Sequence, residues 1–141
     1  ACAMAKDAEK SIAEYILKYY RGSVIEVGVG FRHTVAEHLN RSGIDILTTD
    51  ILDEKKIPDA VNYIRDDITE PDLEIYRDAS LIYSIRPPEE LQIPIARVAS
   101  LVGADLILKP LGCEIVDLSR YFKVCEVVNY RDAVFMLHRF F

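Results

Sequence analysis

Val24-Ile25-Glu26-Val27-Gly28-Val29-Gly30 is the stretch that decides the fold. A mainly apolar, β-branched run leads into two glycines separated by one residue. This pattern predicts a buried strand over Val24–Val27 that ends in a tight loop, because glycine permits a sharp turn and a close approach of the backbone to a ligand. A loop of this kind can hold a nucleotide-like ligand beyond the end of a strand.

Strand and helix patterns alternate along the rest of the chain. Further strands are predicted over residues 44–49, 61–65, 79–85 and 104–108. This alternation predicts right-handed βαβ units and one three-layer, Rossmann-like α/β domain over residues 1–141, with a mostly parallel sheet. Two β-rich runs, 121–130 and 133–141, predict an antiparallel hairpin at its C-terminal edge.

The predicted helices differ in how well their patterns define them. Residues 3–20 carry an apolar stripe of helical spacing, made by Ala5, Ala8, Ile12, Ile16 and Tyr19. A helix of about ten residues is expected after Arg32. Residues 51–60 look too short and too broken for a crossover helix, and residues 70–77 predict one or two helical turns. After Glu89, Pro94 either kinks one helix or begins a new one.

The composition limits the partners of the chain. Its 141 residues are 50% hydrophobic and carry a net charge of −6. An acidic chain with no long basic run is not expected to bind nucleic acid non-specifically. No apolar run approaches the roughly 20 residues of a membrane span, and no signal peptide is recognisable. A cytoplasmic protein is the expectation.

The cysteines and acids do not predict a metal site. Cys2, Cys113 and Cys125 lack a CxxC spacing, so reduced thiols are expected. The acid-rich region between Asp45 and Asp78 also lacks the spacing of metal ligands. We therefore predict no metal.

The ends of the predicted strands collect polar residues. Asp50 follows Gly30 by 20 residues, a spacing at which a carboxylate accepts hydrogen bonds from the ribose hydroxyls of a nucleoside held over the glycine loop. Asp66 and Asp67 end the third predicted strand. Because ligands bind at this edge of an open parallel sheet, these residues are the candidates for a binding site.

The chain resembles class I S-adenosylmethionine-dependent methyltransferases over nearly its whole length. The family's acid-x-Gly-x-Gly motif corresponds to Glu26, Gly28 and Gly30, and its acid at the end of the second strand to Asp50. The acid that approaches the adenine corresponds to the Asp66-Asp67 step, with Asp67 preferred. The resemblance implies a site for S-adenosylmethionine or S-adenosylhomocysteine. The chain is also similar to a small archaeal family of this fold, which implies the architecture and no activity.

The loop also distinguishes between cofactors. A dinucleotide loop has the pattern Gly-x-Gly-x-x-Gly, and here the last position is His33. Glu26 suits a cationic ligand, and S-adenosylmethionine carries a sulfonium and an ammonium group. We therefore favour S-adenosylmethionine over NAD, and a nicotinamide-dependent oxidoreductase is the least favoured function.

Two arginines depart from the pattern of the family. Arg32 stands where a third small residue is usual, and it either points outward or binds an anionic group. Arg86-Pro87-Pro88 stands where amino-methylating members have Asn- or Asp-Pro-Pro. Arg86 stays protonated and cannot act as a base, so it either binds a carboxylate or phosphate or forms an ion pair with Glu89, Glu90 or an acid of the third strand.

Three residues are candidates for catalysis. They are Arg86, Tyr83 and His33. The side chains of Tyr83 and Ser84 point in alternate directions along the predicted strand, so only one of the two faces the cleft. A cap or surface role is the alternative for His33. The leading hypothesis is a methyltransferase-like protein with an unknown acceptor, and the alternative is a non-catalytic binding module. The apolar residues 133–137 predict burial in the sheet, with a homodimer contact as the alternative.

Overall fold

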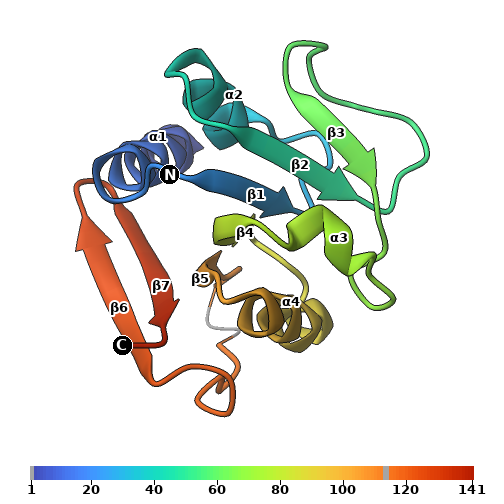
Figure 1. Ribbon diagram of the computed structural model, residues 1–141. Helices are drawn as coiled ribbons and strands as arrows, with labels where there is room; N and C mark the ends of the chain where they lie inside the picture. The colour runs from blue at the N-terminus through green and yellow to red at the C-terminus, as the bar shows by residue number, and fades with distance from the viewer. Residues whose placement is uncertain (1, 113–114) are drawn as a thin grey trace.

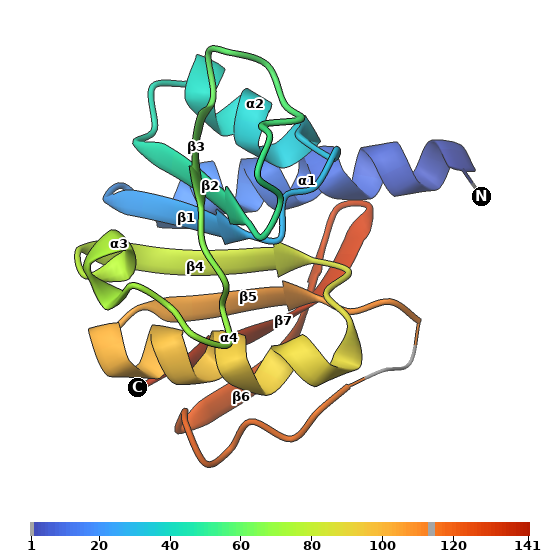
Figure 2. The same cartoon turned by 90° about the vertical axis from the view of Figure 1, so that its right-hand side faces the viewer.

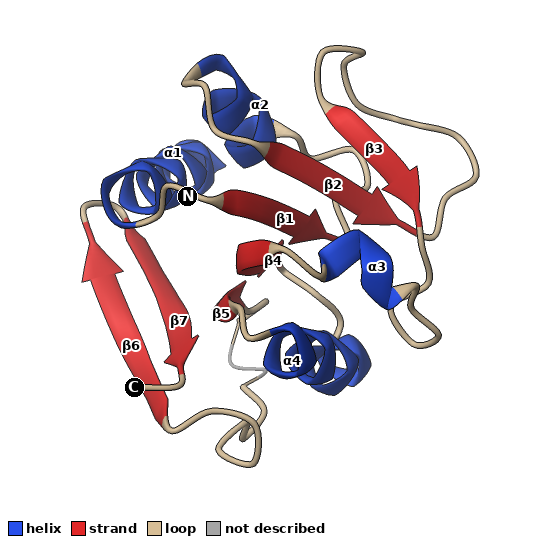
Figure 3. Ribbon diagram, in the orientation of Figure 1, coloured by secondary structure: helices blue, strands red, loops and turns tan. Residues whose placement is uncertain are grey.

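The computed structural model describes residues 2–112 and 115–141, with side chains described from Ala8 onward. Within these ranges, seven strands form one sheet in the order β3-β2-β1-β4-β5-β7-β6 (Figures 1 and 3). The strands are β1 (Ser23–Val27), β2 (Ile46–Asp50), β3 (Asn62–Arg65), β4 (Ala79–Ile85), β5 (Asp105–Lys109), β6 (Val124–Tyr130) and β7 (Ala133–Arg139). The helices are α1 (Cys2–Tyr19), α2 (Thr34–Arg41), α3 (Leu73–Tyr76) and α4 (Glu89–Val102).

The sheet has the predicted mixture of strand directions. The strands from β3 to β5 are parallel, and β7 runs antiparallel to both β5 and β6. The central strand β1 pairs with β2 on one side and with β4 on the other, so the strand order reverses around it. In Figure 2 the arrowheads of β4 and β5 point to the same edge of the sheet. The carboxyl ends of β1, β2 and β4 therefore meet at the switch point where sheets of this type bind ligands.

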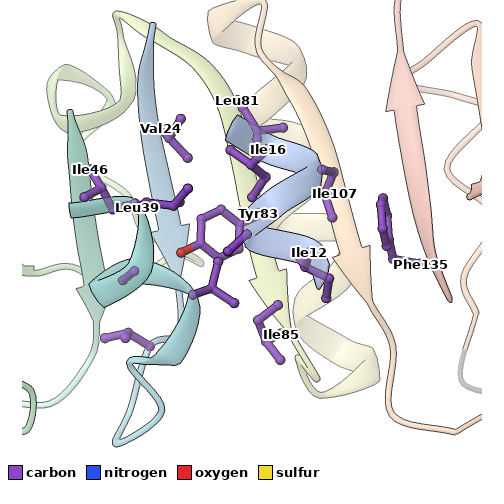
Figure 4. Close-up of a cluster of buried hydrophobic side chains, with 14 of the residues drawn as sticks. Ile12, Ile16, Val24, Leu39, Ile46, Leu81, Tyr83, Ile85, Ile107 and Phe135 are labelled. Atoms are coloured by element: carbon purple, nitrogen blue, oxygen red, sulfur yellow. The ribbon is translucent and has the colours of Figure 1, made fainter. Parts of the chain in front are cut away.

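Helices cover both faces of the sheet, α1 and α2 on one side and α3 and α4 on the other (Figure 1). Val24 of β1 packs in the core under α1 and α2, whereas its neighbour Ile25 packs in the core under α4. Two covered faces explain why β1 and β4 are apolar along most of their length. Figure 4 shows the first core, where Ile12 and Ile16 of α1 and Leu39 of α2 pack over the strands.

The apolar stripe of α1 is buried at Ile12 and Ile16, as predicted, but the prediction for Tyr19 is wrong. Tyr19 is 56% exposed. Its ring centroid lies 4.6 Å from that of Tyr15, which packs against the core in its place. The side chain of Ala5 lies outside the described residues.

The segment after β4 forms one helix. Because α4 runs from Glu89 to Val102, the alternative of a new helix beginning at Pro94 is wrong. Pro94 lies in the second turn, where its missing N–H removes one intrahelical hydrogen bond. The burial of Ile95 and Val98 against the sheet compensates for this loss.

The connections on either side of β3 are short, as predicted. Residues 51–61 contain no helix, and α3 is a single turn of four residues. The helix after the glycine loop, α2, has eight residues rather than about ten.

The C-terminal hairpin confirms the predicted burial for alternate residues of β7 and not for the whole run 133–137. Ala133, Phe135 and Leu137 of β7 are buried on the side covered by α1. Val134 is 47% exposed and Phe141 is 94% exposed. The homodimer contact stays a prediction.

Candidate functional site

A cavity lies at the carboxyl ends of β1, β2 and β3. It measures about 110 Å³, and its lining residues are Val27, Gly28, Asp50, Ile51, Asp66, Asp67, Ile68 and Leu91. A larger cavity of about 200 Å³ lies at the opposite ends of the strands, beside Ser23, Asp45 and Ala79, and contains none of the predicted site residues. The smaller cavity is therefore the candidate site, since it joins four of them: Gly28, Asp50, Asp66 and Asp67.

The glycine loop has a backbone that requires glycine. Gly28 has φ 76° and Gly30 has φ 52°, in the left-handed region that is costly for other residues. A Cβ atom added at Gly28 would come no closer than 3.8 Å to any described atom, that of Ser84 Oγ. The requirement at Gly28 is therefore conformational. The loop turns back toward β2, where the backbone N–H groups of Gly28 and Val29 both donate to the carbonyl of Thr49.

Asp50 holds the loop and the end of β2 together. Its Oδ2 atom accepts from the backbone N–H of Gly30 at 2.8 Å, and its Oδ1 atom accepts from the N–H of Ile51 at 2.7 Å. A carboxylate has about four lone-pair positions, so each oxygen retains the capacity to accept another hydrogen bond. Asp50 can therefore accept both hydroxyls of a ribose without releasing the loop.

The two acids that follow β3 have different environments. Asp66 accepts from the Tyr76 hydroxyl at 2.7 Å and from the backbone N–H of Asp72 at 3.0 Å, so both of its oxygens stabilise the local fold. Asp67 uses only Oδ1, which accepts from the N–H and the hydroxyl of Thr69. These hydrogen bonds lower the pKa of Asp67 and keep it ionised. No described residue bonds to its Oδ2 atom, so Asp67 is the better candidate for a ligand contact.

Glu26 is buried beneath α1 and is not part of the cavity lining. It is 1% exposed and accepts from the Tyr83 hydroxyl at 2.7 Å. Burial raises the pKa of Glu26 to about 8, although the hydrogen bond from Tyr83 opposes this shift. Glu26 is therefore mainly protonated at neutral pH. The predicted contact between Glu26 and a cationic ligand stays a prediction.

Tyr83 and Ser84 do not reach the cavity. Tyr83 is fully buried in the core shown in Figure 4. Ser84 is also buried, and its hydroxyl donates to the Val27 carbonyl at 2.7 Å. Because neither side chain can touch a ligand in the cavity, the catalytic role predicted for Tyr83 is corrected to packing and hydrogen bonding.

Arg32 and His33 are engaged outside the cavity. Arg32 lies at the surface with its side chain 58% exposed, and its Nη1 atom lies 3.1 Å from Oε1 of Glu9, a nearly buried carboxylate of α1. His33 precedes α2, and its Nε2 atom lies 3.2 Å from Oε2 of Glu37. Its Nδ1 atom lies 3.2 Å from the carbonyl oxygen of Phe31. With both nitrogens engaged, His33 stands at the N-cap position of α2 without a side-chain capping hydrogen bond, and its catalytic role stays a prediction.

Arg86 directly follows β4 and has an unusual backbone conformation. It has φ 53°, and its N–H donates to the Lys109 carbonyl at 2.6 Å. Among the described residues, no carboxylate lies within ion-pair distance of Arg86. The predicted ion pair with Glu89, Glu90 or an acid of β3 is therefore wrong.

Sequence reasoning did not identify the apolar walls of the cavity. Ile51 follows β2, Ile68 follows β3 and Leu91 comes from the first turn of α4. Flat, apolar groups such as a purine base suit walls of this kind. The available signal was that each residue lies within a few positions of an acid or proline at a strand end.

Two kinds of feature are absent from the described ranges. No group of three or more His, Cys, Asp or Glu side chains there has the arrangement of a metal site. No helix in the same part of the chain has the length and apolarity to cross a membrane. Cys125 is a free, exposed thiol, and the predictions for Cys2 and Cys113 fall on side chains outside the described residues.

The strand order, the glycine loop and the acid that ends β2 define the methyltransferase-like Rossmann fold. The chain belongs to the family described as Uncharacterised protein family (UPF0146), which matches residues 9–139. The UPF0146 protein of Archaeoglobus fulgidus is 44% identical over 128 residues, which are 91% of this chain and 92% of the relative.

Solved structures show the same fold at low sequence identity. The PH0226 protein of Pyrococcus horikoshii has a TM-score of 0.66 and 13% identity, over 96% of this chain and 90% of that one. The magnesium protoporphyrin IX methyltransferase of Synechocystis, solved with bound S-adenosylmethionine, has a TM-score of 0.63 and 12% identity, over 96% of this chain and 78% of that one. Likeness at this level supports the fold alone.

Proposed function

We propose that the chain binds S-adenosylmethionine, or its product S-adenosylhomocysteine, at the carboxyl end of β1. The observation that carries the proposal is the contact of Asp50 with the glycine loop beside an apolar cavity. The adenine would lie between Ile68 and Leu91, and the ribose hydroxyls would donate to Asp50. The methionine part would cross the exposed Gly28. The cavity of about 110 Å³ is below the usual range for whole ligands, so it would enclose the base and leave the rest of the cofactor on the surface.

The charges of the site favour this cofactor over a dinucleotide. Three carboxylates line the cavity, those of Asp50, Asp66 and Asp67. They oppose the two phosphates of NAD and favour the sulfonium and ammonium groups of S-adenosylmethionine. The side chain of His33 also stands at the start of α2, where a dinucleotide fold has its third glycine.

A thermal-unfolding series tests the proposal. A ligand that binds only the folded chain raises the unfolding temperature, by an amount that grows with the logarithm of the ligand concentration relative to the dissociation constant. S-adenosylmethionine and S-adenosylhomocysteine at millimolar concentration are expected to raise it, and NAD at the same concentration is not. An equal response to all three, or no response, would contradict the proposed cofactor.

A non-catalytic module that binds the same cofactor is the second candidate. Two observations favour it: Tyr83 and His33 do not face the cavity, and the short connections around β3 build no lid over it. Methyl transfer by proximity and orientation needs little acid–base help, so it remains compatible with such a site. Formation of S-adenosylhomocysteine from S-adenosylmethionine in the presence of an added acceptor would show that the chain is a methyltransferase. Binding of S-adenosylmethionine without turnover for any acceptor would favour the non-catalytic module.

A further inference from the structure

Two cations lie side by side where β4 and β5 end. Ile85 is in register with Lys109, and the N–H of the next residue, Arg86, donates to the Lys109 carbonyl. The Lys109 ammonium donates to the Val134 carbonyl at 2.8 Å. Partial burial lowers the pKa of Lys109, and the charge of Arg86 lowers it further. Two positive charges therefore stand on backbones that are hydrogen-bonded to each other at the ends of neighbouring strands.

Among the described residues, no acid forms an ion pair with either cation, although the chain carries a net charge of −6. Within the described ranges, neither Arg86 nor Lys109 takes part in an ion pair. Arg21, Arg97 and Arg120 also form no ion pair there, but they are exposed at the surface. Arg86 differs because it is half-buried, where an unpaired charge is costlier than at the surface.

The backbone also fixes Arg86 in an unfavourable conformation. Its φ of 53° is in the left-handed region, which arginine rarely adopts. Such strained residues concentrate at ligand sites. Here the left-handed backbone at Arg86 ends the extended conformation of β4, so the Arg86 side chain branches off at the carboxyl end of the strand.

The position of the pair connects it to the proposed cofactor site. The Ser84 hydroxyl donates to the Val27 carbonyl, so the end of β4 lies beside the residue that precedes Gly28. Arg86 follows Ser84 by two residues. The cations therefore lie on the β5 side of the glycine loop, and the adenosine cavity beside Asp67 lies on the β2 and β3 side.

Resting on the proposed cofactor function, we infer that Arg86 and Lys109 form a subsite for an anionic group, a carboxylate or a phosphate, of a second ligand that is the methyl acceptor. In the transfer, a lone pair of the acceptor atom forms the bond to the methyl carbon. The electrons of the carbon–sulfur bond return to sulfur, which leaves neutral as the thioether of S-adenosylhomocysteine. The acceptor atom takes the positive charge or releases a proton to water.

Calorimetric titration of the full chain, at low ionic strength and saturated with S-adenosylhomocysteine, tests the subsite. The probes are inorganic phosphate and succinate, which separate the two anion chemistries. We expect one of them to bind the wild type, and Arg86→Asn to weaken it about tenfold or more, because a charge-assisted contact is lost. Asparagine tolerates the left-handed backbone, so this variant keeps the turn. The control Arg97→Gln removes an equal charge from the exposed side of α4 and is expected to leave anion binding unchanged.

The other outcomes have defined meanings. Failure of S-adenosylhomocysteine to bind the wild type contradicts the proposed cofactor. A wild type that binds S-adenosylhomocysteine but neither anion overturns the subsite alone, as does equal anion binding by the wild type and Arg86→Asn. 5′-Methylthioadenosine lacks the carboxylate of S-adenosylhomocysteine. If Arg86→Asn weakens the binding of S-adenosylhomocysteine but not that of 5′-methylthioadenosine, the cations hold the cofactor's own carboxylate, and the acceptor subsite is also overturned.

Discussion

Asp50 and Gly30, 20 residues apart in the chain, are joined by a hydrogen bond of 2.8 Å from the glycine N–H to the Oδ2 atom. The contact ties the loop after β1 to the end of β2. The same carboxylate lines the apolar cavity. One side chain therefore shapes the loop and faces the proposed ribose.

Replacement of Asp50 by alanine is expected to weaken the binding of S-adenosylhomocysteine by about 1–3 kcal/mol, because the ribose hydroxyls would lose their acceptors. Calorimetric titration measures the change. Asp59→Ala removes an exposed acid of the connection between β2 and β3 and is the matched control. Equal affinities for Asp50→Ala and the wild type would remove Asp50 from the ribose site.

Gly28→Ala tests the backbone of the loop. The φ of 76° makes alanine strained by about 1–2 kcal/mol, which denaturant unfolding can measure. Gly103→Ala, at φ 77° beyond the end of α4, is expected to cost a similar amount. Only the variant at Gly28 should also lose affinity for S-adenosylhomocysteine. Equal affinities in both variants would show that the loop does not contact the ligand.

The buried carboxyl of Glu26 predicts a pH dependence of stability. Its pKa is about 8 in the fold against an ordinary value of 4.5, so the folded chain holds a proton that the unfolded chain releases. The contribution to the free energy of unfolding is therefore full below about pH 4.5 and decreases as the pH rises toward 8. Glu26→Gln should flatten this decrease in urea-unfolding series at pH 5, 6.5 and 8. Parallel profiles for the two proteins would place the ionisation elsewhere.

The buried ring of His138 gives the stability a pH dependence of the opposite sign to that of Glu26. Burial lowers its pKa to about 4 from 6.5, and neither ring nitrogen has a hydrogen-bond partner among the described residues. The unfolded chain therefore binds the extra proton, and stability is lost as the pH falls from 6.5 toward 4. His138→Phe, beside the ring of Phe122, should raise the unfolding temperature at pH 5 more than at pH 7.5. A gain that is equal at both pH values would exclude this titration as the cause.

Local patterns were sufficient to predict the fold. The covered faces of β1 and the spacing from Gly30 to Asp50 are both encoded in short stretches, and the structure places Asp50 on the loop. The end of β3 was predicted in the same way, and Asp67 lines the cavity there.

Long-range packing could not be predicted in the same way. Arg32 pairs with Glu9 of α1, a partner 23 residues earlier that no local pattern indicates. Glu26 lies under α1 because alternation along β1 places it on the same face as Val24, and only the topology shows which helix covers that face. The absence of an acid near Arg86, within the described residues, likewise depends on three-dimensional packing.

Calorimetric titration of the wild-type chain with S-adenosylhomocysteine and with NAD tests the central claim most directly. We predict a dissociation constant below about 1 mM for S-adenosylhomocysteine, with one site per chain and no heat of binding for NAD. Binding of NAD with equal or higher affinity, or no binding of S-adenosylhomocysteine, would contradict the account.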